Sequence, residues 1–241
     1  MKSFVSCSTA VVILAISLSG CGSKGSAVYK PTKPKDVPII RVATGEERQL
    51  FPLAEGNEWN YVGNTSVTAA QGSGSRRSEI QFKITKVTQT GSTTRAEMDI
   101  YTDGAKSDHQ IWDVTDQGIF QISAGLDKQT NYSPPQPTIT WPLTPGRTFD
   151  WQGNGLTAEA KVSETKIHST LQEPREVDTL AGPIFAYGVE GQITPTGKEK
   201  SAGVTLAYWA PKVGLVRFTQ QINTTASVAK ISLSLKSYTL K

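Results

Sequence analysis

The amino-acid sequence predicts an all-β fold: an antiparallel meander of about 10–12 strands forming a curved sheet, a half-barrel or a barrel, with little helix. Apolar and polar residues alternate over several segments, and turn-forming clusters such as TDGAK, TDQG and SPPQP separate those segments. No window of about twelve residues carries an apolar stripe at helical spacing. The strands are therefore expected to follow one another through short turns.

Alternation with a period of two places every second side chain on the same face of a strand. In residues 227–238 the predicted inward face carries Ala229, Ile231, Leu233 and Leu235. Three earlier segments show the same pattern, with inward sets Ile80, Phe82 and Ile84; Ala96, Met98 and Ile100; and Leu156, Ala158, Ala160 and Val162. One buried and one wet face favour an antiparallel sheet over a buried parallel one.

An eleven-residue phrase occurs twice, as FPLAEGNEWNY in residues 51–61 and as WPLTPGRTFDW in residues 141–151. Each copy predicts a turn, built around a proline and a glycine, followed by a strand that carries two rings on one face. Two copies suggest two similar halves around one aromatic cluster, although shared turn chemistry alone would also explain them. The candidate aromatic residues, which either fill the core or line a ligand cavity, are Trp59, Tyr61, Trp141, Phe149, Trp151 and Trp209.

Residues 1–20 have the pattern of a bacterial lipoprotein signal peptide. Lys2 precedes an apolar run of signal-peptide length, and the run ends in LSGC, which resembles the lipobox of bacterial lipoproteins. The resemblance implies that Cys21 becomes the first mature residue and carries the lipid, including fatty acyl chains such as palmitate, that holds the protein on a membrane. Gly22 after the lipidated cysteine implies an outer-membrane location facing the periplasm, if the organism has two membranes.

Residues 21–49 are predicted to be a tether, because they are rich in Gly, Ser, Pro and Lys and show no sustained period. Its lysines could also attract anionic lipid headgroups. The formal net charge of +4 falls to +3 once Lys2 leaves with the signal, which is too small to indicate a nucleic-acid partner. Because Cys7 also leaves, no disulfide and no cysteine-based metal site is expected in the mature chain.

Residues 50–241 are long enough for a single β domain with a sizeable core. Three phrases resemble, in order, those of a group of uncharacterised secreted or lipid-anchored all-β bacterial proteins. The first is FPLAEGNEWNY, the second is VDTLAGPIFAYGVE in residues 177–190, and the third is the hairpin LAYWAPKVGLVRF in residues 206–218. The sequence departs from the second phrase at Pro183 and Ile184, where Thr-Phe is expected. The resemblance implies an architecture distantly similar to the half-barrels of lipoprotein carriers, and it implies no catalytic residues.

Catalytic and metal-binding patterns are not evident. His109 with Asp113 and Glu97 is one imaginable metal set, but the spacing does not support it, and both His109 and His168 are predicted to be solvated loop residues. No G-x-S-x-G elbow occurs, and GSGS is followed by Arg76-Arg77, so it is no phosphate loop. The carboxylates considered for hydrolysis, all predicted on wet strand faces, are Asp99, Asp113, Glu159 and Glu190.

The sequence therefore predicts a membrane-anchored envelope lipoprotein that is not an enzyme and needs no cofactor or metal. Its β domain is expected to bind another envelope protein as an interaction module. The alternative is a carrier or sensor of a hydrophobic ligand such as a lipid acyl chain, because large rings stand at many turns and strand starts. A hydrolase is the third class.

Overall fold

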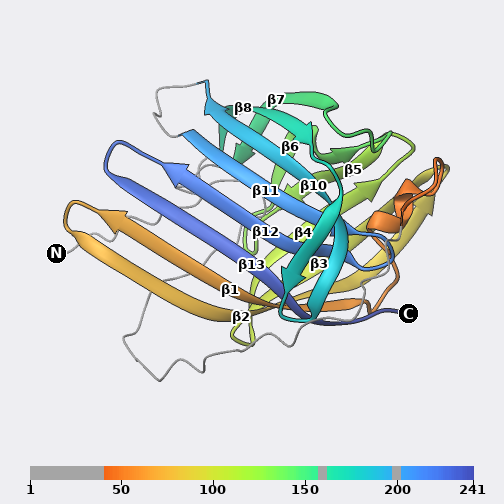
Figure 1. Cartoon of the computed structure of the whole chain (residues 1–241), viewed down its shortest axis with the longest axis horizontal. Coiled ribbons are helices and arrows are strands. Elements are labelled where there is room, and N and C mark those ends of the chain that lie inside the picture. The colour runs from red at the N-terminus through yellow and green to blue at the C-terminus, as the bar shows by residue number, and fades with distance from the viewer. Residues whose placement is uncertain (1–40, 157–161, 197–201) are drawn as a thin grey trace.

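The computed structural model describes residues 41–156, 162–196 and 202–241 (Figure 1). The expected signal peptide, Cys21 and the tether up to residue 40 lie outside the described residues, as do Ala158, Glu159 and Ala160. The described chain forms 13 strands and one four-residue 3-10 helix, η1. The all-β prediction is confirmed: twelve of these strands close into an antiparallel barrel.

The elements follow one another with short turns, as a meander requires. Their bounds are η1 (Glu47–Leu50), β1 (Glu58–Ala69), β2 (Gly72–Thr90), β3 (Thr93–Thr102), β4 (Ala105–Val114), β5 (Gly118–Ala124), β6 (Thr130–Thr140), β7 (Thr148–Leu156), β8 (Val162–Leu171), β9 (Arg175–Thr179), β10 (Gly182–Pro195), β11 (Ala202–Ala210), β12 (Gly214–Asn223) and β13 (Ser227–Thr239).

Each barrel strand pairs with two neighbours. The sheet order is β11-β12-β13-β1-β2-β3-β4-β5-β6-β7-β8-β10-β9, and an additional pairing of β10 with β11 closes the ring. The first and last strands of the described chain, β1 and β13, are neighbours. Closure removes the unpaired edges that an open sheet would expose, except at β9, which pairs only with the first part of β10.

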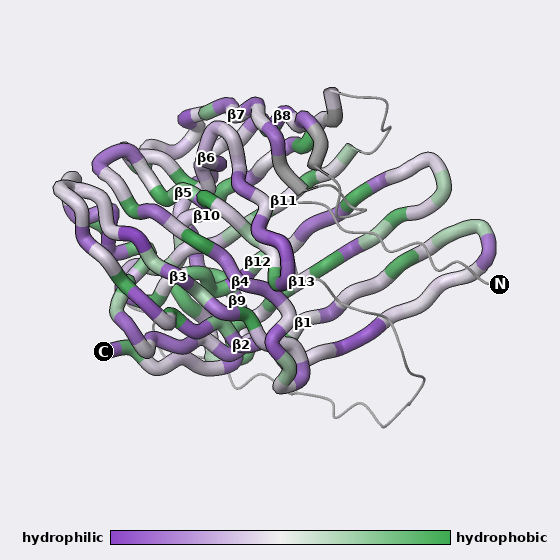
Figure 2. The backbone as a smooth tube through the Cα atoms, turned by 180° about the vertical axis from the view of Figure 1, so that it is seen from behind, coloured by the Kyte–Doolittle hydropathy of each residue, from purple (hydrophilic) through white to green (hydrophobic). Residues whose placement is uncertain are grey.

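The predicted alternation of side chains is confirmed on β2, β3 and β13. The predicted strand over residues 156–162 is wrong, because Leu156 ends β7, Val162 begins β8 and the two residues pair with each other. Ile80, Phe82 and Ile84 on β2 are almost completely buried, while the residues between them are exposed or half-buried. Leu233 and Leu235 on β13 are likewise buried. Figure 2 shows hydrophobic and hydrophilic residues following one another along the backbone. The inward set forms one core, because a barrel has a single interior to fill.

The two copies of the repeated phrase make similar turns around their glycines, and they differ at the proline, where the Trp141–Pro142 bond is cis. The Gly56 amide donates to the carbonyl of Ile84 at 2.8 Å, and the Gly146 amide donates to the carbonyl of Leu171 at 2.8 Å. Both glycines have positive φ, 86° and 78°, a region that glycine enters without steric cost. The phrases lead into β1 and β7, which are six strands apart in a ring of twelve. They therefore begin on opposite sides of the barrel and at the same end, which we call the base; the opposite end is the rim.

The β9–β10 hairpin departs from the meander, because it folds back over the outside of the barrel. The Arg217 guanidinium on β12 donates to the carbonyl of Asp178 at 3.3 Å, and the Ala181 amide donates to the carbonyl of Leu235 on β13 at 2.9 Å. Val177 on β9 is buried beneath the hairpin. In Figure 1 the teal β9 crosses in front of the blue strands β11, β12 and β13.

Residues 42–50, most of them within the segment expected to be a tether, contact the barrel. The Val42 amide donates to the Tyr187 hydroxyl at 3.0 Å, and the Lys212 amide donates to the carbonyl of Gln49 at 2.7 Å. Leu50 is fully buried in the core. Among the described residues, no helix has the length and apolar composition needed to cross a bilayer.

Candidate functional site: the barrel interior and an outer trough

A ring cluster fills the base of the barrel. The Phe51 centroid lies 6.0 Å from that of Trp59, 5.7 Å from that of Trp112 and 5.4 Å from that of Trp209. Tyr61 packs on Phe82 at 4.8 Å. Tilted and edge-on rings at these separations attract one another beyond the area that they bury.

Two residues of this cluster are hydrogen-bonded to the turn between β11 and β12 and to the residue that follows it. The Trp59 indole N–H donates to the carbonyl of Val213, and the Tyr61 hydroxyl donates to the carbonyl of Leu215 at 2.8 Å. Burial raises the pKa of the Tyr61 hydroxyl well above its ordinary value. The void left among the rings is about 10 Å³, which is at most the space of one water molecule. The cluster is therefore packed core.

The six candidate aromatic residues do not form one group. Trp59, Tyr61 and Trp209 belong to the ring cluster at the base. Trp151 lies apart with Tyr132, at a centroid distance of 6.3 Å, and its indole N–H donates to the carbonyl of Pro134 at 3.0 Å. The remaining two, Trp141 and Phe149, are half-buried at the margin of the core.

A polar layer lies above the rings, and the sequence reading did not identify it. Asp108 and Gln110 on β4 face inward with 1% and 0% exposure. One Asp108 carboxylate oxygen accepts from the amides of His109 and Gly125, both at 2.8 Å, and the other accepts from the Gln110 side chain at 2.8 Å. Gln110 in turn accepts from the Trp112 indole at 3.0 Å. The alternation Asp108-x-Gln110-x-Trp112 was the signal available in the sequence.

Burial dominates the chemistry of this layer. Desolvation raises the pKa of Asp108 above its ordinary value, although three hydrogen-bond donors favour the charged form. Burial, with a smaller contribution from the Asp108 charge, also raises the pKa of Tyr132. In this layer, the described side chains of Gln121, Gln136 and Tyr132 each keep a buried polar atom without a hydrogen-bond partner. Raised pKa values with burial as the main cause fit structural carboxyl and hydroxyl groups.

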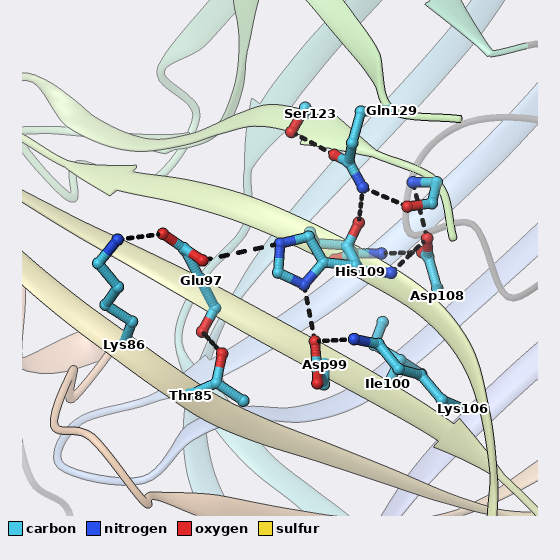
Figure 3. Close-up of polar contacts among 12 residues, drawn as sticks. Thr85, Lys86, Glu97, Asp99, Ile100, Lys106, Asp108, His109, Ser123 and Gln129 are labelled. Carbon is cyan, nitrogen blue, oxygen red and sulfur yellow. Dashed lines mark hydrogen bonds and ion pairs between the residues drawn. The ribbon is translucent and has the colours of Figure 1, made fainter. Parts of the chain in front are cut away.

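His109 lies on the opposite, outward face of β4 (Figure 3). Its Nδ1 lies 2.7 Å from the Asp99 carboxylate, which also accepts from Lys106 at 2.8 Å, and its Nε2 lies 4.0 Å from the Glu97 carboxylate. Burial alone would raise the pKa of Asp99, but hydrogen bonds from Lys106 and His109 outweigh it and lower that pKa. The remaining carboxylate oxygen of Glu97 accepts from Lys86 at 2.9 Å.

The histidine prediction needs correction, because both histidines lie on strands. His109 is on β4 and His168 is on β8, where its Nδ1 lies 2.7 Å from the exposed Asp150. Pairing of strands, which brings Asp99 opposite His109, supplies partners that a loop would not. In the described parts of the chain, no group of three or more His, Cys, Asp or Glu residues could hold a metal ion.

The wet-face prediction for the carboxylates also needs correction. Asp99 and Asp113 do face outward, but each is only 8% exposed, because cations cover them. Asp113 accepts two bonds of 2.7 Å from Arg95, a bidentate geometry that fixes both side chains. Glu190 is half-buried. Among the carboxyl groups described, the one inside the barrel is Asp108, which was not among the candidates.

A large hollow lies on the outside of the barrel. It has a volume of about 700 Å³ and crosses β2, β1, β13, β12, β11 and β10 in that order. We call it the outer trough. One row of outward side chains along it consists of Arg77, Asn64, Ser232, Thr219, Leu206 and Glu190.

A second hollow of about 310 Å³ lies between β9 and the barrel wall. It is lined by residues of β9 and by Leu206, Tyr208, Arg217 and Thr219 of the barrel. Leu206 and Thr219 also line the outer trough, so the two hollows adjoin. Arg175 of β9 stacks on the Tyr208 ring at 5.1 Å and donates to its hydroxyl, which holds the hairpin in place.

Comparison with solved structures supports the fold. A candidate lipoprotein of Parabacteroides distasonis matches with a TM-score of 0.51 and 15% identity, over 79% of this chain and 98% of that chain. A candidate exported protein with a YmcC-like fold from Bacteroides fragilis matches with a TM-score of 0.46 and 14% identity, over 78% and 98%. The hypothetical lipoprotein YmcC of Escherichia coli gives a TM-score of 0.39 and 9% identity, over 72% and 83%.

No protein-family model matches the chain, and no curated protein matches it significantly. The class that the fold defines is thus an all-β barrel similar to that of the Parabacteroides protein. The predicted resemblance to secreted and lipid-anchored all-β proteins is confirmed at the level of fold.

Proposed function

We propose that the protein is a lipid-anchored protein of the cell envelope whose barrel is a non-catalytic binding module for another envelope protein. The lipobox LSGC supports the anchor at Cys21, and Gly22 supports an outer-membrane location facing the periplasm in an organism with two membranes. The similarity in fold to a candidate lipoprotein agrees with an envelope address.

One observation carries the binding role: the base of the barrel is solid, while the outside carries a hollow of about 700 Å³. An acyl-chain carrier needs an enclosed apolar space, and the ring cluster leaves about 10 Å³. The outer trough is instead open and lined mainly by hydroxyl, amide and charged side chains, which suit a polar macromolecular partner.

If Cys21 carries the lipid anchor, its substitution should change the cell fraction in which the protein is found. Replacing Cys21 by serine removes the thiol that receives the lipid, so the protein should move from the membrane fraction to the soluble envelope fraction and lose label from an alkyne fatty acid. Cys7→Ser is the matched control, because it leaves the lipobox intact and should remain in the membrane fraction. A Cys21→Ser chain that stays labelled would contradict the anchor.

The binding role predicts a site-specific crosslink in living cells. A photoreactive benzoylphenylalanine at Ser232, on the floor of the outer trough, should give one discrete adduct of higher mass with an envelope protein. The same residue at Thr88, exposed on β2 and outside the lining of the trough, should give none. No adduct at Ser232, or equal adducts at both sites, would contradict the proposal.

A further inference from the structure

The outer trough runs beside a free strand edge. β9 crosses the barrel strands at a steep angle: Arg175 stacks on Tyr208 of β11, and Asp178 accepts from Arg217 of β12. The trough crosses the same strands, through Leu206 of β11 and Thr219 of β12. β9 lines the second hollow, which adjoins the trough at Leu206 and Thr219, so β9 runs beside the trough and roughly parallel to it.

The edge of β9 that faces away from β10 has main-chain groups available for pairing. Asp178 lies opposite Pro183 of β10, and proline has no amide proton, so this is a non-hydrogen-bonded pair. The amide and the carbonyl of Asp178 therefore point to the free edge, as do those of Glu176 two residues earlier. The bond from Arg217 to the carbonyl of Asp178 agrees with this direction.

Charges of opposite sign stand at the two ends of the trough. Arg77 on β2 is exposed at one end, and Lys230 on β13 is exposed about halfway along; neither makes an ion pair within the described ranges. Glu190 on β10 stands at the other end. A ligand that lies along the trough would be oriented by these charges.

The length of the trough fits a short extended segment. Six neighbouring strands are separated by five spacings of about 4.8 Å, which gives roughly 24 Å. An extended chain rises about 3.4 Å per residue, so roughly seven residues span the distance. Every second side chain of such a segment would point down onto the floor formed by Ser232 and Thr219.

We propose that the outer trough binds an extended peptide segment of a partner protein, which adds to β9 as a further antiparallel strand. This inference rests on the proposed function, because it takes the trough to be the binding surface. β9 runs from the acidic end toward the basic end. The antiparallel segment therefore places acidic residues at its N-terminal end, against Arg77, and basic residues at its C-terminal end, against Glu190.

The test is a selection of displayed ten-residue peptides on the full-length chain purified in detergent. Enriched peptides should be free of proline in the middle, alternate small or β-branched residues, and carry acidic residues before basic ones. Asp178→Pro removes the free-edge amide without touching a bond to β10, and it should weaken binding at least tenfold, measured by fluorescence anisotropy. Asp178→Ser is the matched control, because it removes the same carboxylate and keeps the amide, and it should bind nearly as the original chain does.

Three results would overturn strand addition: no enrichment over display without peptide, enrichment of proline-rich peptides, or equal affinity for Asp178→Pro and Asp178→Ser. Equal melting temperatures of the two variants ensure that loss of binding does not reflect unfolding. The crosslink at Ser232 separates the two proposals. If the adduct forms in both variants, the trough binds a partner without strand addition, and if no adduct forms, the proposed function itself fails.

Discussion

Replacing Trp59 by alanine is expected to lower the free energy of unfolding by about 3–5 kcal/mol, the usual cost of deleting a buried tryptophan side chain. The side chain is 1% exposed, packs on Phe51 and donates its indole N–H to Val213. A Cβ on Gly214 would lie 3.2 Å from the indole nitrogen, so the backbone is also packed closely there. Urea unfolding followed by circular dichroism measures the change.

Trp141→Ala is the matched control for this substitution. Trp141 opens the second copy of the repeated phrase, but its ring is only half-buried, and its indole N–H donates to the carbonyl of Thr115 at 3.2 Å. Its removal should cost clearly less, because less apolar surface leaves the core. Two results together would show that the rings line a ligand cavity. The stability of Trp59→Ala would be unchanged, and native mass spectrometry would detect a bound acyl chain on the original chain but not on the variant.

Replacing Asp108 by alanine is expected to cost about 2–5 kcal/mol, because several buried donors lose their acceptor at once. The amides of His109 and Gly125 and the side chain of Gln110 all donate to this carboxylate. Asp150→Ala is the control, since that side chain is 79% exposed and pairs only at the surface. Similar losses for the two variants would show that the polar layer adds nothing to stability.

The raised pKa of Asp108 determines how its contribution to folding stability changes with pH. Because burial makes the folded state bind this proton more tightly than the unfolded state does, Asp108 favours folding most at low pH. That contribution declines as pH rises from the ordinary aspartate pKa of 3.8 through the raised value. The stability difference between the original chain and Asp108→Ala should therefore shrink over this window in urea titrations. A difference that grows with pH would contradict the assignment.

Much of the barrel could be predicted from local pattern. Alternation gave the inward faces of β2, β3 and β13 correctly, because a strand with one face in the core and one in water must alternate. The glycines of the repeated phrase identified two turns that the structure shows to be similar, Gly56 and Gly146. These features depend only on neighbours in sequence, which is why sequence reasoning reached them.

The remaining features depend on which strands become neighbours. In β9, the buried Val177 and Thr179 alternate with the exposed Glu176 and Asp178. The same alternation would occur if β9 were a strand of the ring, so the sequence did not indicate that β9 lies over the outer face beside the outer trough. Asp108 was missed for a similar reason. Its inward direction follows from the pairing of β4 with β3 and β5, whereas its polar neighbours in sequence suggested a solvated stretch.

The pairing of β1 with β13 has a consequence for export. The register joins Trp59 to Tyr238 and Ala69 to Ser227, so the ring cannot close until residues separated by more than half of the chain have met. Non-local pairing of this kind forms late and slowly. A chain that is threaded through a membrane in order would therefore stay unfolded during most of its passage, since the strand that completes the barrel is the last of the thirteen to cross. For an exported chain, this topology would delay folding until passage across the membrane is nearly complete.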